Sequence, residues 1–502
     1  MLFPKNRLRS LKAVRIVTHV LPPLGLFLLW RSSEIRRLTK VLGTLYIAAY
    51  SVLWASGILS LLIFGFGVDL VEWRGGYLPV ITFSKTVPDY DKLESSRARQ
   101  ARDGLRSAAR QAPSYVGSYW TGFRGANHEG VYEEQPILTN WPAAGLRELW
   151  RQPIGGGYAS FAIAEGRAYT IEQRRQQEVV TAYEIDTGLE LWAHAWNARF
   201  QEMVGQDGPR ATPAYDQGRI YALGGTGEFR CLDAASGSLL WRCNIMEQNH
   251  AEAMKYGVSA SPLIVDQKVI VLPGGQDGCS VVAYNKTNGI PVWKSANDKQ
   301  AYTSPMLVTL AGQDQLLIVS ARNVLGLAPE DGRVLWHTPW LIQNDNAIAQ
   351  PVLLSTNRFL LSGGYGLGCA AFEVTQSDSA FEARQLWHNT FLKNKFTSSV
   401  LYEGNIYGLD DAVLTCLDAT TGERKWRQGR YGFGQLLLAS GHLIVLGGDG
   451  VLALVAATPL RFQELAHFQA LHGKTWNHPA IANGRLFVRN AVEMACFDIS
   501  IP

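Results

Sequence analysis

The chain of 502 residues lacks several features that would place it in a common functional class. Lys and Arg exceed Asp and Glu by only four, which is too small an excess to indicate a nucleic-acid-binding surface. The six cysteines contain no Cys-x-x-Cys-His sequence, which excludes the usual attachment of a c-type haem. The ten histidines show no His-x-x-His or His-Glu-x-x-His spacing, so they give little support for a zinc enzyme. Glycine (49) and tryptophan (15) are plentiful, which fits an all-β repeat protein.

A short hairpin recurs along the chain, with its clearest copies at residues 230–241 and 415–426. Apolar residues lead into Leu-Asp, a turn with Ser or Thr before Gly follows, and the next strand ends on Trp. Asp and Ser or Thr bond to their own backbone in such a turn, and Gly accepts the positive φ. One hairpin cannot bury its own apolar face, so the copies are expected to stack.

Alignment on the apolar residue before the turn finds eight copies, at Tyr183, Leu232, Tyr284, Leu327, Phe372, Leu417, Leu454 and Phe497. Their spacing of roughly 37 to 52 residues is that of a four-stranded propeller blade. The seventh copy has Leu465 where the others have Trp, and the eighth has no final strand. Residues 146–150 end on Trp without a preceding hairpin, so this strand is predicted to complete the last blade. The predicted fold is therefore an all-β, eight-bladed β-propeller over residues 120–502.

A second repeat precedes each hairpin, where a small or polar pair stands before Pro. It occurs at Pro213, Pro262, Pro305, Pro351 and Pro479. Pro fits the first position of a strand, and small residues suit an innermost strand where blades crowd the axis. The repeated Trp residues are expected to pack between neighbouring blades, and truncating one to Ala should cost about 3–5 kcal/mol.

Residues 1–84 are predicted to form an α-helical N-terminal membrane anchor. Residues 41–68 are an uncharged apolar run long enough to span a bilayer, so a transmembrane helix is expected there. Residues 16–30 form a shorter run, broken by Pro22-Pro23, and whether it is re-entrant or spanning stays open. No small-residue cleavage site follows either run, which favours a retained anchor.

Basic residues flank the first run on both sides, at the N-terminus and in the loop before the second run. Both basic segments can be cytoplasmic only if residues 16–30 do not cross. The expected location is then the inner (cytoplasmic) membrane, with the propeller on the periplasmic or extracellular side. Residues 85–119 are predicted to be a basic linker. A helix over 97–111 would align four arginines, which leaves open a solvated linker or contact with anionic lipid or a partner.

These motifs resemble the PQQ-like (pyrroloquinoline quinone repeat, quinoprotein-like) β-propellers. Residues 120–125 (WTGFRG) with Gly130 resemble the N-terminal strap of that family, and residues 208–225 and 281–305 resemble its second and third blades. The resemblance implies an eight-bladed propeller. It also implies kinship with two groups, the PQQ-dependent alcohol dehydrogenases and the non-enzymatic members similar to the outer-membrane-protein assembly lipoprotein. The front of the chain resembles a common bacterial anchor.

A PQQ dehydrogenase needs a carboxylate base and a Ca²⁺ site of carboxylate and amide oxygens. The enzymatic branch of the family often adds two adjacent cysteines, which this chain lacks. Most aspartates occupy repeat turns, namely Asp186, Asp233, Asp331, Asp418 and Asp498, where turn formation explains them. Cys231, Cys416 and Cys496 share one repeat position, which indicates core packing. No catalytic residue, metal or cofactor is predicted. PQQ with Ca²⁺ belongs only to the alternative, and whether the protein is an enzyme stays open, with the balance against it.

The favoured function is a membrane-anchored extracytoplasmic propeller that acts as a protein-interaction or assembly module, as a subunit of a membrane complex. Its expected partners are the membrane and another membrane or periplasmic protein, and no nucleic acid. The alternative is a PQQ-dependent alcohol or sugar dehydrogenase, and a third reading is a sensor of a sugar or polymer.

The expected working surface is the mouth of the central funnel, where each blade returns to the next inner strand. Counting three residues back from each inner-strand Pro finds Arg210, Ser259, Tyr302, Ile348 and Trp476, and Tyr158 aligns with them in the first blade. Tyr158, Arg210, Tyr302 and Trp476 are the predicted ligand- or partner-binding residues, because binding sites favour such side chains. The alternative, that these residues only plug the funnel or shield neighbouring loops, stays open. Replacing Arg210 and Trp476 together by Ala is expected to weaken binding and barely change stability.

Overall fold

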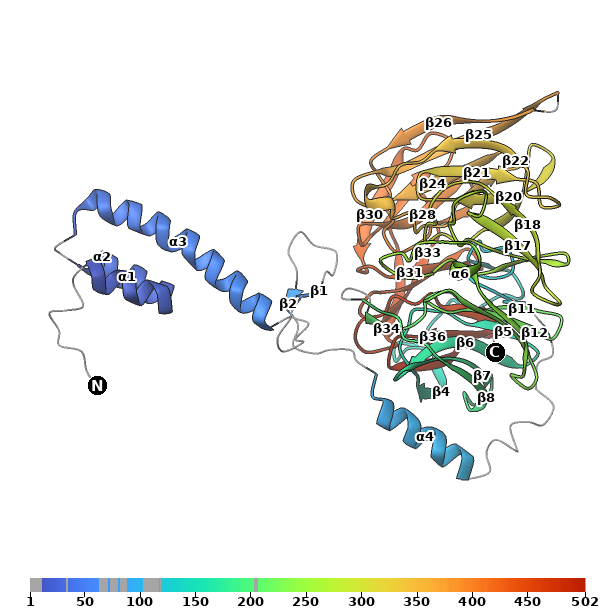
Figure 1. The fold of residues 1–502 in the computed structure, drawn as a ribbon, viewed down its shortest axis with the longest axis horizontal. Helices are drawn as coiled ribbons and strands as arrows, with labels where there is room; N and C mark the ends of the chain where they lie inside the picture. Colours follow the sequence, from blue (N-terminus) through green and yellow to red (C-terminus); the bar gives the residue numbers. More distant parts are fainter. Residues whose placement is uncertain are drawn as a thin grey trace. The chain divides into compact units, whose positions relative to one another are not determined.

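The computed structural model describes residues 11–32, 35–62, 71–72, 80–81, 88–102, 117, 119–202, 206–378 and 380–501. The chain divides into two compact units (Figure 1). The first comprises Met1–Glu72 and Leu78–Lys85, and the second comprises Trp73–Tyr77 and Thr86–Pro502.

The first unit contains three helices, α1 (Leu11–Val20), α2 (Pro22–Arg31) and α3 (Arg37–Ser60), and the short strands β1 (Val71–Glu72) and β2 (Val80–Ile81). Pro22 begins α2, a position where the missing N–H of proline costs nothing. A Cβ at Gly25 would lie 2.8 Å from the Cα of Thr18, so glycine there lets α1 and α2 approach closely.

The apolar runs of the first unit form helices where the structure describes them. The run 16–30 lies in α1 and α2, and the predicted helix 41–68 begins earlier, at Arg37. Among the described residues, α3 alone has the length and apolar composition to cross a membrane. Its 24 residues extend about 36 Å, more than the thickness of a bilayer core. Residues 63–68 lie outside the described residues.

The second unit is an eight-bladed propeller of four-stranded antiparallel blades, as predicted. Blades 1 and 2 contain β5 (Ala162–Ala164), β6 (Arg167–Arg174), β7 (Gln177–Glu184), β8 (Glu190–Asn197), β11 (Ala214–Asp216), β12 (Arg219–Leu223), β13 (Glu228–Asp233) and β14 (Leu239–Asn244). Blades 3 and 4 contain β15 (Leu263–Val265), β16 (Lys268–Val271), β17 (Val281–Asn285), β18 (Pro291–Ser295), β19 (Met306–Leu310), β20 (Gln313–Val319), β21 (Asn323–Leu327) and β22 (Val334–Pro339).

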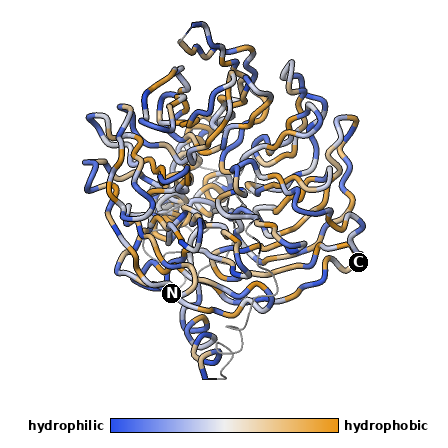
Figure 2. The backbone as a smooth tube through the Cα atoms, turned by 90° about the vertical axis from the view of Figure 1, so that its right-hand side faces the viewer, coloured by the Kyte–Doolittle hydropathy of each residue, from blue (hydrophilic) through white to orange (hydrophobic). Residues whose placement is uncertain are grey.

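The remaining blades follow the same order, inner strand first. Blades 5 and 6 contain β23 (Val352–Ser355), β24 (Arg358–Gly363), β25 (Gly368–Ser377), β26 (Ala380–Asn389), β27 (Val400–Tyr402), β28 (Asn405–Asp410), β29 (Val413–Asp418) and β30 (Arg424–Arg430). Blade 7 contains β31 (Gln435–Ala439), β32 (His442–Leu446), β33 (Val451–Ala456) and β34 (Glu464–Gln469). Blade 8 contains β35 (Ala480–Ala482), β36 (Arg485–Arg489), β37 (Glu493–Asp498) and β4 (Arg147–Pro153). Hydrophobic and hydrophilic stretches alternate along the strands (Figure 2).

The last blade is closed by a strand from the front of the chain, as predicted. β4 pairs antiparallel with β37, and Trp150 faces Cys496 in the ladder. Upstream, β3 (Val131–Tyr132) adds a parallel strand to β31 of blade 7. This closure leaves no open edge between the first and last blades, and the neighbouring strands hold the two ends of the propeller together.

Trp192 and Trp241 each connect two neighbouring blades. In each case the ring packs against the glycine in the turn of the next blade, and the indole N–H donates to a backbone carbonyl of that turn. The Trp192 indole donates to the carbonyl of Ala234 (3.1 Å), and Trp241 donates in the same way to Lys286 (3.0 Å). Gly237 has φ +72°, and a Cβ there would lie 2.5 Å from the Trp192 ring. The Thr/Ser-Gly turn therefore serves two purposes: it reverses the chain, and it leaves room for an indole.

Every blade carries a β-bulge at one equivalent place, directly before the aligned apolar residue. In blade 2 it lies between Cys231 and Leu232. In blade 7 it lies between Leu454 and Val455, so Val455 and not Leu454 is the equivalent residue. The alignment of that blade is wrong by one residue, and Ala466, which faces Leu454, holds the place of the Trp.

The beginning of the propeller domain fills the central axis from one end. We call residues 119–132 the strap. Trp120 bridges to Ile163 of an inner strand, and the carbonyl of Thr121 accepts from the backbone N–H of Tyr215. The Arg124 side chain is buried at the centre and donates to four backbone carbonyls, those of His128, Glu129, Ser399 and Leu436. The strap therefore closes the face that carries the turns between inner and second strands.

A series of side-chain hydrogen bonds links the inner strands of blades 1 to 6 around the axis. The backbone N–H of one blade donates to the polar side chain at the equivalent position of the next blade. The sequence of donors and acceptors is Ser160 to Thr212, Thr212 to Ser261, Ser261 to Ser304, Ser304 to Gln350 and Gln350 to Ser398. This explains the polar residue before Pro213, Pro262, Pro305 and Pro351, because its side chain accepts a hydrogen bond from the preceding blade.

Part of the predicted linker is a helix that belongs to the propeller. α4 (Tyr90–Arg102) lies beside β4, β7 and β8 (Figure 1). Arg97 is buried, and it donates to the Pro153 carbonyl (2.9 Å) and pairs with Glu190 (3.2 Å). Arg99 and Arg102 are exposed, whereas Arg106 and Arg110 lie outside the described residues.

Candidate functional site

The mouth of the funnel is formed by the loops that return from an outer strand to the next inner strand. The structure brings three of the four predicted site residues together there. The rings of Tyr158 and Trp476 stack with centroids 5.6 Å apart, and the guanidinium carbon of Arg210 lies 5.6 Å from the centroid of the Tyr158 ring.

The stack continues on both sides into a chain of contacts that we call the aromatic ladder: Phe200, Arg210, Tyr158, Trp476, Phe396 and Phe433. Phe396 stacks on Trp476 at 4.7 Å and meets Phe433 edge-on at 5.4 Å. The ammonium of Lys474 lies 3.7 Å from the centroid of the Trp476 ring.

Arg210, a member of the ladder, is held in place by two polar contacts. Its guanidinium pairs with Glu202 (3.0 Å) and donates to the Gly208 carbonyl (3.2 Å). The two paired side chains are only 11% and 9% exposed. Burial lowers the pKa of Arg210, and the charge of Glu202 acts against that shift. Because removing Arg210 would leave Glu202 unpaired in a poorly hydrated place, the expectation that stability would barely change is revised.

Tyr302 lies apart from the stacked rings. Its hydroxyl accepts from the backbone N–H of Tyr256 (3.4 Å), and the two rings lie 5.6 Å apart. Burial raises the pKa of Tyr302 to about 12, so the phenol is protonated at neutral pH. The hydroxyl of Ser259 donates to the carbonyl of Gly257, and Ile348 is half-buried.

Sequence reasoning missed Phe396 and Phe433, although both hold the same place as the predicted residues. They stand three residues before Ser399 and Leu436, which replace Pro at the start of the inner strands of blades 6 and 7. The rule that used Pro as a marker could not find these two blades. A rule that counts back from the turn after each inner strand would have found both.

Glu178 joins blades 1 and 2 at the mouth. Its side chain is fully buried and accepts from the backbone N–H of Gly225 (2.8 Å) and the indole of Trp196 (3.1 Å). Burial raises the pKa of this carboxyl to about 7, since these two hydrogen bonds only partly offset the loss of hydration.

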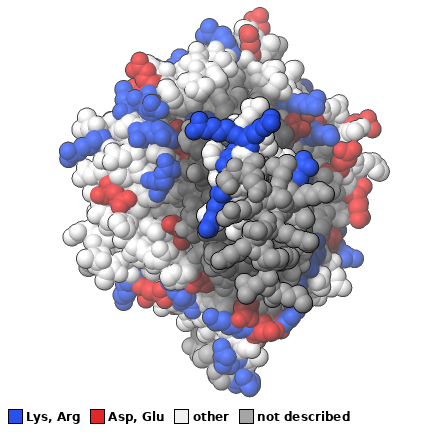
Figure 3. Space-filling model, turned by 90° about the vertical axis from the view of Figure 1, so that its left-hand side faces the viewer, with Lys and Arg blue, Asp and Glu red and all other residues white. Residues whose placement is uncertain are grey.

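The described carboxylates near the aromatic ladder do not offer a free base for a quinone site with Ca²⁺. Within the described ranges, no group of three His, Cys, Asp or Glu side chains is arranged to hold a metal ion. Two carboxylates beside the mouth loops are already engaged: Glu202 by Arg210, and Glu172 by Arg174 and the backbone N–H of Gly155. Lys, Arg, Asp and Glu side chains all occur around the rim of the face in Figure 3.

The closed eight-bladed ring with its repeated Trp and Gly defines the chain as a PQQ-like β-propeller. A family model described as outer membrane protein assembly factor BamB matches residues 175–428, and the chain belongs to this family. None of the curated proteins matches the chain.

Solved structures with the same fold include both branches of the family. BamB from Moraxella catarrhalis is 16% identical with a TM-score of 0.51, and the match covers 70% of this chain and 100% of that one. The quinohemoprotein alcohol dehydrogenase from Comamonas testosteroni is 12% identical with a TM-score of 0.53, over 80% and 84% of the two chains. The enzyme ADHIIG from Pseudomonas putida HK5 is 10% identical with a TM-score of 0.54, over 78% and 81%. At these identities the likeness concerns the fold alone.

Proposed function

We propose that this protein is a membrane-anchored, extracytoplasmic interaction module whose funnel mouth binds a polypeptide segment of a membrane or periplasmic partner. The observation that carries the proposal is the aromatic ladder. Tyr158, Trp476 and Phe396 are half-buried rings at the open end of the axis. Large rings that are held in place but still accessible are typical anchors of protein interfaces.

The chemistry of the ladder suits a segment that carries aromatic and acidic side chains. An incoming ring can extend the stack on Trp476, and the positive charge of Lys474 over that ring favours an acidic neighbour. The family supports a protein partner, because the matching model is described as an assembly factor. A role as a subunit of a membrane complex follows from the same argument.

The expected membrane topology rests on the short helices of the first unit. α1 and α2 have ten residues each, about 15 Å, and are separated by Leu21. Neither is long enough to cross a bilayer of about 30 Å, which supports a re-entrant hairpin. Both basic segments then stay in the cytoplasm, and α3 leads the propeller out of it.

Reporter fusions at the C-terminus test this topology. We expect activity from a reporter that works only after export, and none from a reporter that works only in the cytoplasm. The reverse pattern would place the propeller in the cytoplasm and contradict the proposal.

The partner site is tested by affinity capture from solubilised membranes. The double variant Tyr158→Ala/Trp476→Ala should lose the proteins that the unchanged chain retains. A matched double variant, Leu239→Ala/Leu240→Ala, removes exposed apolar side chains from outer strand β14 and should retain them. Retention of the same proteins by the mouth variant, with its melting temperature confirming the fold, would rule out this surface.

A PQQ-dependent dehydrogenase is the second candidate, because two quinohemoprotein alcohol dehydrogenases share the fold. The engaged carboxylates Glu172 and Glu202 argue against it. Alcohol- or sugar-dependent reduction of a dye that requires added PQQ and Ca²⁺ would favour this function over the interaction module.

A further inference from the structure

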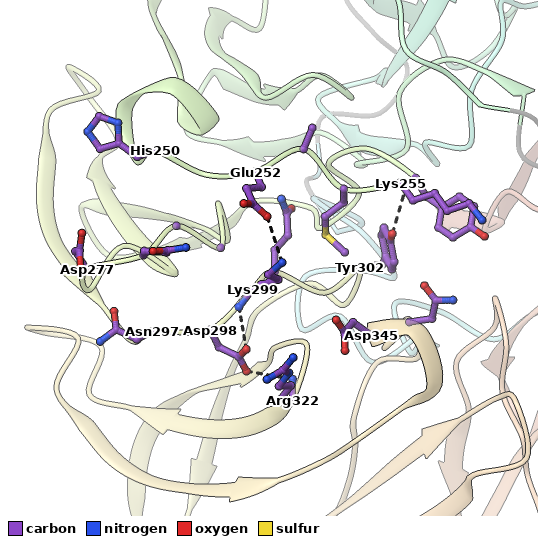
Figure 4. A pocket seen from close by; sticks show the side chains of 18 residues that line it. His250, Glu252, Lys255, Asp277, Asn297, Asp298, Lys299, Tyr302, Arg322 and Asp345 are labelled. Atoms are coloured by element: carbon purple, nitrogen blue, oxygen red, sulfur yellow. Dashed lines mark hydrogen bonds and ion pairs between the residues drawn. The ribbon is translucent and has the colours of Figure 1, made fainter.

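A cavity of about 750 Å³ lies beside the mouth, away from the aromatic ladder (Figure 4). Its walls are the mouth loops of blades 2 to 5, with residues 252–256, 274–277, 297–300 and 345–346. Tyr302 is shared with the predicted mouth residues, whereas none of the ladder residues lines the cavity. The volume is in the range of about 300–1,000 Å³ that is usual for small-molecule sites. We call it the off-axis pocket.

The charges of the off-axis pocket nearly cancel. Lys299 pairs with Glu252 (3.2 Å) at the rim. Asp298 accepts from the hydroxyl of Ser320 (2.5 Å) and the backbone N–H of Arg322 (3.1 Å), so it acts as part of the wall. Two further cations, Lys255 and Arg322, and two further carboxylates, Asp277 and Asp345, line the cavity, so that with Asp298 the lining has one negative charge in excess. A balanced site of this kind does not select a strongly charged ligand.

Several hydrogen-bonding groups of the pocket have unused capacity. The Gln300 side-chain carbonyl is buried and has no hydrogen-bond partner in the described part of the protein, and the residue is 3% exposed. Its amide nitrogen approaches only the sulfur of Met246 (3.7 Å), a weak acceptor. Leaving such a group unpaired is costly, so a hydroxyl of a ligand or water is expected beside it. Asn297 uses its carbonyl for the N–H of Gly278, which leaves its amide N–H groups for a ligand.

The two ends of the pocket differ in character (Figure 4). Tyr302 lies at one end, next to Tyr256 and Lys255, and supplies an aromatic surface with a protonated hydroxyl. Asp277, Asn297 and His250 lie toward the other end and are polar. A ligand that spans the pocket therefore needs an apolar face at one end and several hydrogen-bonding groups at the other.

We propose that the off-axis pocket binds a neutral, hydroxyl-rich ligand, a short oligosaccharide. A sugar hydroxyl both donates and accepts, so neighbouring hydroxyls can satisfy a carboxylate and an amide at once. The C–H face of a sugar ring packs on a tyrosine ring. A highly charged peptide or nucleotide would leave uncompensated charge in a site where positive and negative groups nearly balance.

The test uses the full-length chain in a detergent without a sugar headgroup, with three neutral trisaccharides as probes: maltotriose, cellotriose and N,N′,N″-triacetylchitotriose. We expect at least one of them to bind, measured by saturation-transfer NMR and calorimetric titration. Asp345→Asn should weaken that binding about tenfold or more, because a hydrogen bond to a charged group is replaced by a neutral one. Asn tolerates the left-handed backbone of Asp345 (φ +56°), so the loop should keep its shape.

Two controls make the outcome decisive. Asp331→Asn changes a carboxylate in a turn of blade 4 outside the pocket, where it accepts from the N–H of Arg333, and should leave the affinity unchanged. Trp476→Ala changes the ladder and should also leave it unchanged, which separates this proposal from the proposed partner site. Failure of all three probes to bind would overturn the proposal, as would an unchanged affinity in Asp345→Asn.

Discussion

Both ends of the propeller axis have large aromatic side chains beside an arginine, but the two ends differ in how deeply the aromatic rings are buried. At the strap end, Trp120, Arg124 and Tyr132 are at most 1% exposed, and the cation is satisfied by backbone carbonyls of the strap and of blades 6 and 7. At the mouth, Tyr158 and Trp476 are half-buried and contact mainly other rings and cations. The same residue types thus stabilise the fold at one end and remain available for a partner at the other.

The largest effect is expected at the closed end. Arg124→Met keeps the volume but leaves four carbonyl acceptors without their donor, so the free energy of unfolding should fall by about 3 kcal/mol or more. Arg102→Met, on the exposed side of α4, should have almost no effect. Denaturant unfolding measures both. Equal stability of the two variants would mean that the strap does not lock the axis.

The next effect depends on pH and concerns Glu178. Its folded-state pKa is raised from 4.5 to about 7, so the folded protein holds its proton while the unfolded chain loses it. This group therefore lowers stability progressively as pH rises from about 4.5 to 7, by roughly 3 kcal/mol in total. Glu178→Gln should remove that dependence.

Unfolding of the unchanged chain and of Glu178→Gln across this pH window measures the difference. The variant should gain in relative stability with rising pH and level off above pH 7. A constant difference between the two proteins would show that Glu178 ionises normally in the folded state.

At the mouth, Arg210→Ala should cost about 2 kcal/mol, less than the roughly 3–5 kcal/mol of a fully buried pair. The loss comes from Glu202, which is left without its cation. The double variant Arg210→Ala/Glu202→Ala should lose less than the sum of the two single variants. Additive losses in thermal melts would mean that this ion pair contributes nothing.

The smallest effect on stability is expected for Trp476→Ala. The ring is half-buried and makes two stacking contacts, so the loss should be about 1–2 kcal/mol. Trp192→Ala, between blades 1 and 2, should lose about 3–5 kcal/mol. If the two variants lose equally, Trp476 is a core residue and the contrast between the two ends of the axis disappears.

The propeller was predictable because its signals are local and repeated. The repeated hairpin, with a Trp at its end in most blades and a Pro before five of the inner strands, identified the blades, and the strand ending at Trp150 identified the closure. The blade without a Trp was misaligned by one residue, because Leu465 is apolar and stands next to Ala466, which occupies the Trp position.

The candidate site was only partly predictable. Arg210 and Trp476 were found because a Pro stands three residues after each, and Tyr158 was found by aligning the first blade with the others. That Arg210 is paired and buried could not be inferred, since Glu202 precedes it by eight residues in a short hairpin, β9 (Gln201–Glu202) with β10 (Gln206–Asp207), that belongs to none of the repeats. The off-axis pocket is assembled from four blades, and no single segment carries its signature.

The closing strand also means that the last blade can form only after the end of the chain has been synthesised. Pro153 of β4 pairs with Glu493 of β37. At a synthesis rate of about 5–20 residues per second, roughly 20–70 s pass between the emergence of these two partners. During that time β4 has an unsatisfied edge, and the first blade lacks a neighbour on one side. The newly made chain must therefore be protected from pairing with other chains until its last strand appears.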